Sequence, residues 1–209
     1  MRGYAECAIE ILDQLHVSSI VTLGWSLGGH ISLEMQSLLQ QHKPETIDIN
    51  GIMLVGTPPS SGPDQTAMGF FKDPKSSVMP FSNQEILTEL EATEFAHVAT
   101  GSPREAWQRD SAIRTDGRAR KTMFSSFRAG HGVDQVTVVK ESSRTLYGVV
   151  NGAEDPFVNL DYLDNLTWGR LWKGKCIRIE GTGHAPFWEQ PKEFELILRD
   201  FLVDSGLTK

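Results

Sequence analysis

The sequence has few cysteines, no long apolar run and no excess of positive charge. Its two cysteines, Cys7 and Cys176, are too few for a disulfide framework in 209 residues, which favours free thiols and a cytoplasmic location. Glu6, Glu10 and Asp13 interrupt the N-terminal segment, and no later stretch has the length of a membrane span, so we expect neither a secretory leader nor a transmembrane helix. The net charge of −7 argues against a nucleic-acid partner and favours a neutral or apolar small molecule.

The most informative segment is Gly-Trp-Ser-Leu-Gly, centred on Ser26. The bare pattern Gly-x-Ser-x-Gly is expected by chance about 0.1 times in a chain of this composition, so the context decides between a nucleophile and an ordinary glycine-rich turn. Residues 20–23 predict a short buried strand, and residues 30–41 carry apolar side chains at helical spacing. A serine in the strained turn between a strand and a helix forms a nucleophile elbow, where Gly24 and Gly28 allow the two elements to crowd together. Ser26 is therefore the candidate nucleophile.

Short apolar runs recur along the chain and alternate with helical patterns. Runs at residues 52–55, 145–150 and 176–180 predict three further strands, and residues 4–15 predict an amphipathic helix with one apolar stripe. Short apolar strands separated by helices are typical of a parallel sheet that is covered by helices on both faces. The expected fold class is α/β.

Between residues 60 and 143 the strand signal disappears and three helices are expected. Residues 82–85 (Ser-Asn-Gln-Glu) and 102–105 (Ser-Pro-Arg-Glu) both fit a capping box, the second with proline at the first helical position. Asp116 fits the N-cap of the third helix. We interpret this region as an inserted helical domain.

The length of the chain favours one core with an insertion rather than two independent domains. The core is predicted to consist of residues 1–61 and 144–209, and the inserted helical lid of residues 62–143.

A serine nucleophile needs a base that accepts its proton and an acid that orients the base. The strand at 145–150 runs into a turn that holds Glu154 and Asp155, and the strand at 176–180 runs into a glycine-rich loop that holds His184. Catalytic groups gather at the carboxyl ends of such strands, and no other histidine of the chain follows a strand in a glycine-rich turn. We therefore predict His184 as the base and Asp155 as the acid, with Glu154 as the alternative acid.

Taken together, these three motifs resemble the α/β-hydrolase superfamily, in its esterase-like branch with a serine nucleophile and a helical lid. The segment Gly-Trp-Ser-Leu-Gly-Gly is similar to the family elbow, Gly-Ala-Glu-Asp to its acid loop and Gly-His-Ala-Pro-Phe-Trp-Glu-Gln-Pro to its histidine loop. The resemblance extends from about Tyr4 to Leu202. It implies an α/β-hydrolase fold and hydrolysis of an ester or related acyl bond, with no metal and no organic cofactor.

The sequence departs from the family pattern in its N-terminal part. Family members carry strands before the elbow, and a loop after an early strand supplies one oxyanion-hole amide, whereas this sequence opens on the helix before the elbow strand. The N–H of Leu27 is a candidate donor, and loss of the other donor would cost about 3 kcal/mol of transition-state stabilisation. We expect the N-terminal part of the fold to be missing and the elbow strand to offer an open edge for pairing with a second copy.

Two functional hypotheses follow. In the first, the chain is a serine hydrolase that cleaves a small-molecule ester or related acyl bond through an acyl-enzyme: Ser26 attacks, His184 relays the proton and Asp155 orients His184. In the second, it is a catalytically impaired remnant of the same fold that binds a ligand or a partner. Thioesterase, lactonase, carbon–carbon hydrolase and acyltransferase activities all remain open.

Overall fold

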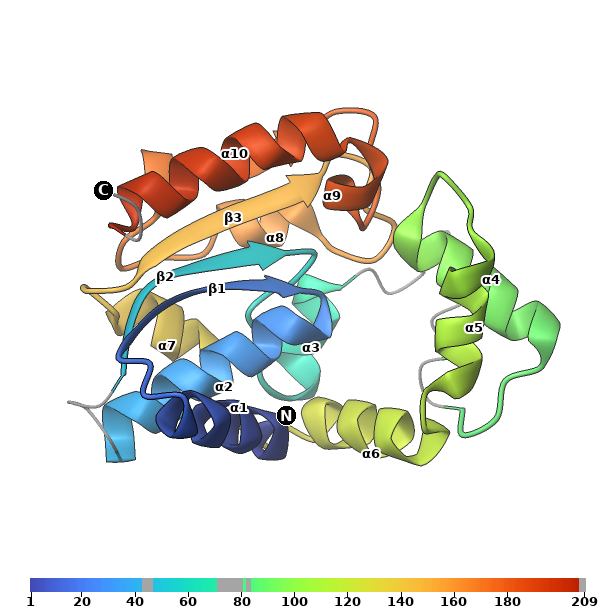
Figure 1. Ribbon diagram of the computed structural model, residues 1–209, viewed down its shortest axis with the longest axis horizontal. Helices are drawn as coiled ribbons and strands as arrows, with labels where there is room; N and C mark the ends of the chain where they lie inside the picture. Colours follow the sequence, from blue (N-terminus) through green and yellow to red (C-terminus); the bar gives the residue numbers. More distant parts are fainter. Residues whose placement is uncertain (43–46, 71–80, 82–83, 207–209) are drawn as a thin grey trace.

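In the part of the chain that the structure describes, four parallel strands form the centre of the molecule (Figure 1). The computed structural model describes residues 1–42, 47–70, 81 and 84–206. The strands are β1 (Ser19–Trp25), β2 (Asp48–Val55), β3 (Leu146–Gly152) and β4 (Ile177–Ile179), and they lie in the order β1-β2-β3-β4. The helices of the described part are α1 (Arg2–Gln14), α2 (Leu27–His42), α3 (Gly62–Gly69), α4 (Glu89–Thr100), α5 (Ala106–Arg114), α6 (Gly117–Arg128), α7 (Gln135–Glu141), α8 (Leu160–Asp164), α9 (Pro186–Glu189) and α10 (Pro191–Asp204), with a short 3-10 turn at Trp172–Gly174. The predicted α/β class, a parallel sheet with helices flanking it, is confirmed.

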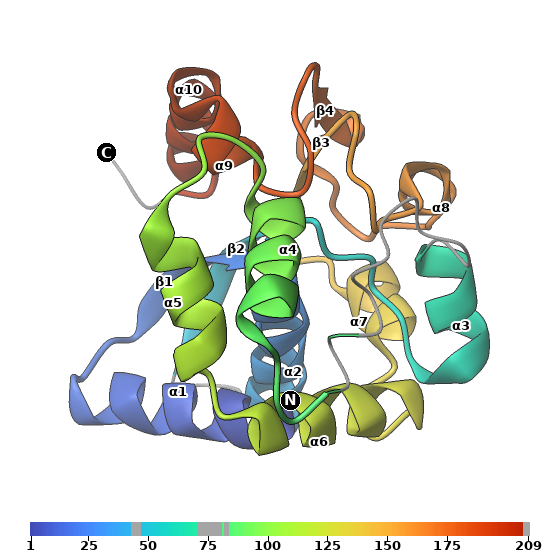
Figure 2. The ribbon, with the colours of Figure 1, turned by 90° about the vertical axis from the view of Figure 1, so that its right-hand side faces the viewer.

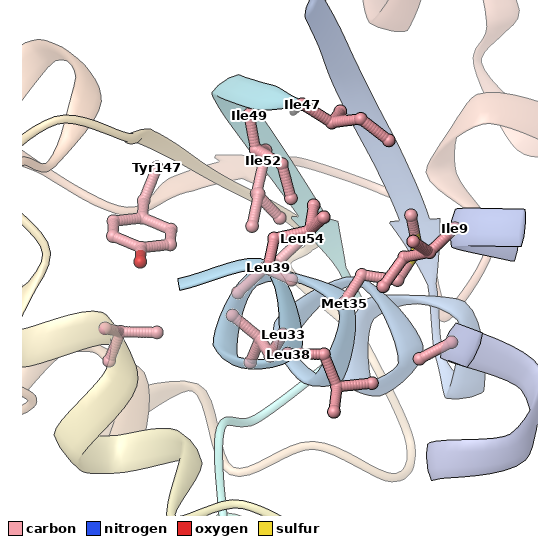
Figure 3. Packing of buried hydrophobic residues seen from close by; sticks show 12 residues of the cluster. Ile9, Leu33, Met35, Leu38, Leu39, Ile47, Ile49, Ile52, Leu54 and Tyr147 are labelled. Carbon is pink, nitrogen blue, oxygen red and sulfur yellow. The ribbon is translucent and has the colours of Figure 1, made fainter. Parts of the chain in front are cut away.

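Helices cover both faces of this sheet, because successive side chains of a strand point to opposite faces. On β2, Ile52 and Leu54 pack with the apolar side chains of α2, whereas Met53 and Val55 pack with those of α10, including Phe201. Figure 3 shows the first of these layers, in which Leu33, Met35, Leu38 and Leu39 of α2 lie under β2. The continuous apolar run over 52–55 is therefore explained by burial of both faces.

Among the described residues, strand β1 lies at the edge of the sheet and pairs only with β2. The prediction of a buried strand over residues 20–23 is correct for the strand but wrong for its burial, because the Leu23 side chain is 42% exposed. The expectation of an open edge is confirmed for the described part of the chain. An apolar strand with one unpaired side is a surface on which further strands can add.

Helix α1 is present as predicted, but its predicted apolar stripe of Cys7, Ala8, Ile11, Leu12 and Leu15 is buried only in part. Ala8 and Leu12 pack against the core next to the buried Ala5 and Ile9, whereas Ile11 and Leu15 are exposed. The physical reason is that α1 packs against α2 through the side that carries the small Ala5 side chain. The apolar pattern predicted a helix, but the neighbouring element determined which side became buried.

Between β2 and β3 the described residues contain five helices, α3 to α7, rather than three. Asp116 is confirmed as an N-cap, since its Oδ1 accepts a hydrogen bond of 2.9 Å from the N–H of Arg118. The box predicted at Ser102 is wrong, because α5 begins at Ala106 and the Gln108 side chain accepts a hydrogen bond of 2.8 Å from the N–H of Glu105.

The remaining predicted box, at residues 82–85, includes Ser82 and Asn83, which lie outside the described residues. Helix α4 begins later, at Glu89. Its capping box consists of Thr88, whose Oγ1 accepts from the N–H of Glu91, and Glu91, whose carboxylate accepts from the N–H of Thr88. Several polar residues in this region can cap a helix, and packing selects among them.

Helices α4, α5 and α6 stand beside the carboxyl ends of the strands (Figures 1 and 2). Helix α7 instead packs against α2, next to the sheet. The division into a core and a lid at residues 62 and 143 stays a prediction. In the described part, no helix is both long and apolar enough to cross a membrane.

Candidate active site

Ser26 lies in the turn between β1 and α2, in a strained backbone conformation. Its φ is 50°, in the left-handed region that residues with a side chain rarely adopt. The turn is held by two contacts with the end of β2: the Ser26 N–H donates to the carbonyl of Val55 at 2.7 Å, and Thr57 Oγ1 donates to the carbonyl of Ser26 at 2.6 Å. Strain of this kind is retained where the surrounding structure enforces it, and it is frequent at functional sites.

Two glycines allow the start of α2 to lie close to β1 and to Thr57, but one of them differs from the prediction. A Cβ on Gly24 would collide with the backbone of Gly29, and a Cβ on Gly29 would collide with the side chain of Thr57. A Cβ on Gly28 would meet nothing within 4 Å, so the steric role predicted for Gly28 belongs to Gly29. The close packing around Ser26 therefore requires glycine at positions 24 and 29.

Asp155 and His184 are joined by a buried hydrogen bond of 2.8 Å between Oδ2 and Nδ1. The other carboxylate oxygen of Asp155 accepts from the N–H groups of Phe157, at 2.8 Å, and Val158, at 3.1 Å. A carboxylate only accepts hydrogen bonds, so the proton of neutral His184 lies on Nδ1 and the lone pair on Nε2. Glu154, the alternative acid, is exposed to solvent.

The imidazole of His184 lies against the end of β2, one residue beyond the carbonyl that holds Ser26. A Cβ on Gly56 would lie 2.5 Å from Cε1 and 2.6 Å from Nδ1 of His184, and Gly56 has a φ of 59°. The indole of Trp25 donates from Nε1 to the carbonyl of His184 at 2.8 Å, which ties the histidine loop to the residue before Ser26. Only glycine fits at position 56, because any side chain there would displace the imidazole.

The structure thus brings Asp155 and His184 into direct contact and sets the Ser26 turn beside them. No hydrogen bond joins the side chains of Ser26 and His184 among the described residues. Leu27 is the first residue of α2, so its N–H has no acceptor within the helix and lies next to the Ser26 side chain along the chain. An N–H in this position can bind a developing oxyanion.

A second histidine, His30, is buried one helical turn beyond Ser26. Its Nδ1 lies 2.7 Å from Oε1 of Gln135, and its ring contacts the ring of Phe127 of α6 in a tilted arrangement, with 4.5 Å between centroids. Burial lowers the pKa of His30 to about 4, so its ring is neutral at pH 7. His30 therefore connects α2 with α6 and α7 and is not paired with an acid.

Sequence reasoning missed three contributors to this geometry: Gly56, Thr57 and Glu189. Gly56 and Thr57 follow directly on a predicted strand, and this position is the available signal for them. Glu189 lies in the predicted histidine loop, and its Oε1 accepts a hydrogen bond of 2.8 Å from the N–H of Gly183. Within the described ranges, no group of three or more His, Cys, Asp or Glu side chains has an arrangement that would hold a metal ion.

Comparisons with known proteins agree with this architecture. A profile described as the alpha/beta hydrolase family matches residues 2–195. Among solved structures, the N-acyl homoserine lactonase AidH in complex with N-butanoyl homoserine is 39% identical, with a TM-score of 0.89, and the match covers 100% of this chain and 72% of that one. Comparison with curated proteins gives no significant match.

Two more distant structures share the fold. The esterase RhEst1 from Rhodococcus sp. ECU1013 is 19% identical, with a TM-score of 0.67, over 92% of this chain and 68% of that one. The carboxylesterase CesB from Bacillus subtilis is 15% identical, with a TM-score of 0.69, and the match covers 97% of this chain and 66% of that one. From the profile match and the 39% identity to a solved hydrolase, the chain belongs to the alpha/beta hydrolase family.

Proposed function

We propose that this protein hydrolyses a carboxylic ester through a catalytic triad of Ser26, His184 and Asp155. The observation that carries the proposal is the buried bond between Asp155 and His184 next to the strained turn at Ser26. Family membership supports a hydrolase, and the site supports the choice of residues. Catalytic hydrogen bonds to the nucleophile often tighten only when substrate binds, so the unbound geometry at Ser26 is compatible with this role.

The proposed reaction proceeds in two steps. The Oγ of Ser26 attacks the ester carbonyl while Nε2 of His184 takes its proton, and the Leu27 N–H donates to the oxyanion. The carbon–oxygen bond to the leaving alkoxide then breaks, and His184 returns the proton to that oxygen. Water, activated by His184, hydrolyses the acyl-Ser26 ester and regenerates the hydroxyl. Asp155 stays ionised and stabilises the imidazolium in both steps.

We infer that the ester is a lactone with an N-acyl substituent. The support is the 39% identity to a lactonase whose structure holds N-butanoyl homoserine, with the whole of this chain matched. In a lactone the alkoxide stays tethered to the acyl group, so the product is one ring-opened hydroxy acid rather than two fragments.

Apolar side chains beside the triad fit such an acyl group. The ring of Phe157 meets the His184 ring edge-on at 4.8 Å between centroids. Phe157 belongs to an apolar cluster with Val158, against which Phe95 and Val98 of α4 pack. A substrate that reached His184 from the side of α4 would therefore meet hydrophobic groups, which favours an acyl chain over a charged one.

The test combines turnover with active-site labelling. Wild-type protein, Ser26→Ala and the matched control Ser125→Ala are assayed with N-hexanoyl homoserine lactone and p-nitrophenyl butyrate, and each is treated with a fluorophosphonate probe. Ser125 is exposed on α6, so its hydroxyl has no part in the proposed chemistry.

We expect turnover and labelling of the wild type and the control, and neither in Ser26→Ala. Equal labelling of Ser26→Ala would contradict the assignment of the nucleophile. Lactone binding by the wild type without turnover or labelling would favour the alternative, a binding protein that retains the triad residues.

A further inference from the structure

Glu189 holds the loop that carries His184. It is the last residue of α9, a four-residue turn that begins at Pro186, directly after the histidine loop. Its carboxylate reaches back along the chain, and Oε1 accepts the hydrogen bond of 2.8 Å from the N–H of Gly183. The N–H of Glu189 also donates to the carbonyl of Ala185, at 3.0 Å. Contacts from one residue therefore fix the backbone on both sides of His184.

The same carboxylate touches the corner between α4 and α5. A Cβ on Gly101, the C-cap residue of α4, would collide with the carboxylate of Glu189, and Gly101 has a φ of 68°. Beside it, Trp188 donates from Nε1 to the carbonyl of Pro103 at 2.8 Å, and its ring meets Trp107 edge-on. Figure 2 shows this corner next to α9. Glu189 therefore lies between the histidine loop and the α4–α5 corner.

The acceptor role of Glu189 follows from its hydrogen bond with the Gly183 N–H, while burial opposes the charged form of its carboxyl. Burial raises the pKa of its carboxyl, and the carboxylates of Glu154 and Asp155 act in the same direction, against the N–H groups of Gly183 and Ala185. A hydrogen bond at a site with limited water is not freely replaced by solvent, so its loss leaves the N–H of Gly183 without an equivalent partner.

We propose that Glu189 is a positioning residue. It sets the orientation of His184 through its hydrogen bond with Gly183, and its contact with Gly101 in the α4–α5 corner determines where its carboxylate lies. The proposal rests on the proposed function, because it assigns Glu189 a part in the reaction at Ser26. It differs from a purely structural role, since it predicts a change in kcat without loss of the fold. A misplacement of about 1 Å at a catalytic group can lower a rate about a hundredfold.

The kinetic test uses Glu189→Ala, Glu189→Gln and the control Glu195→Ala, whose side chain is exposed on α10. With N-hexanoyl homoserine lactone, Glu189→Ala should lower kcat between about tenfold and a hundredfold, with KM within about twofold of the wild type. Glu189→Gln keeps an acceptor oxygen for the Gly183 N–H and should recover most of kcat. Glu195→Ala should behave as the wild type does.

A double-mutant cycle tests the link to the α4–α5 corner. Gly101→Ala places a methyl group against the carboxylate, so alone it should lower kcat about as much as Glu189→Ala does. In the Glu189→Ala background, Gly101→Ala should add less than about threefold, because the group it displaces is gone. Additive losses would contradict a shared mechanism.

Amide hydrogen exchange separates this proposal from the proposed function. In Glu189→Ala the Gly183 amide should lose protection while amides of β2 keep theirs, whether or not the protein turns over the lactone. Unchanged kcat in Glu189→Ala, with an active wild type, would overturn the role of Glu189 and leave the triad in place. An inactive wild type would contradict the triad, and unchanged Gly183 protection would then overturn the positioning role as well.

Discussion

At the scale of the residue, the left-handed backbone conformation of Ser26 is expected to lower the free energy of unfolding. A residue with a side chain held at a φ of 50° costs about 1 kcal/mol or more relative to glycine. Ser26→Gly should therefore raise the free energy of unfolding by about 1 kcal/mol while abolishing turnover. Ser26→Ala removes the hydroxyl but keeps the strain, so it should abolish turnover without this gain. Urea denaturation of the two variants gives the comparison, and equal stabilities would contradict the account.

The assignment of Asp155 as the acid of the triad can be tested against the adjacent carboxylate of Glu154. Asp155→Asn keeps the shape of the side chain but allows its amide to donate to Nδ1 of His184, which moves the imidazole proton to Nε2 and removes the base. The expected loss in kcat is about a thousandfold to ten-thousandfold. Glu154→Gln changes the exposed alternative and should leave kcat within about twofold of the wild type. The opposite pattern, measured by steady-state kinetics, would make Glu154 the acid.

Much of the candidate site could be predicted from residue type and order along the chain. Ser26, Asp155 and His184 each follow a strand, and that placement is visible as an apolar run that ends in glycine-rich sequence. Gly56 also follows a predicted strand, but its role, like that of Glu189, could not be predicted from this placement. Their roles depend on contacts between segments far apart in the sequence, Gly56 with the imidazole of His184 and Glu189 with Gly101.

At the scale of the element, α2 links the elbow to α6 and α7 through His30. Its folded pKa of about 4 lies below the ordinary value of 6.5, so the unfolded chain takes up the proton first as pH falls. The stabilisation is complete above pH 6.5 and is lost as pH falls from 6.5 towards about 4. The loss amounts to about 3 kcal/mol at its maximum.

Removing the ionisable group should remove this part of the pH dependence. His30→Asn keeps an N–H donor for Oε1 of Gln135 but cannot take up a proton. The free energies of unfolding of wild type and variant, from urea titrations between pH 4 and pH 8, should therefore converge as pH falls. Parallel curves for the two proteins would show that His30 does not titrate in this range.

Elements were predictable where one pattern dominated, and less so where several signals competed. The apolar runs located all four strands because each is buried on at least part of its surface. Helix starts between β2 and β3 were predicted less well. Ser102 and Glu105 both offer caps within a few residues, and burial of Gln108 at 3% exposure favours the later start.

At the scale of the whole molecule, the sheet formed by the described residues ends in an open edge at β1. This strand carries no charged side chain, and its Leu23 is exposed. Edge strands without charge can pair with another strand, because their outer N–H and C=O groups are free. Pairing of two β1 strands from two copies was expected from the sequence and stays a prediction.

A charge at this edge should prevent such pairing. If copies associate through β1, the wild type should show a dimer by light scattering after size-exclusion chromatography, and Leu23→Lys should shift it to the monomer. The control Leu196→Lys changes an exposed leucine on α10, away from the edge, and should leave the dimer intact. A monomeric wild type, or a dimer that is unaffected by Leu23→Lys, would contradict pairing through β1.

The central claim is that Ser26 forms an acyl-enzyme during ester hydrolysis. The most direct measurement is mass spectrometry of protein quenched during turnover of p-nitrophenyl butyrate, followed by peptide mapping. The account predicts a butyryl group on the peptide that contains Ser26, and none on the same peptide from Ser26→Ala. Turnover with no acyl group on Ser26, or with the acyl group on another residue, would contradict it.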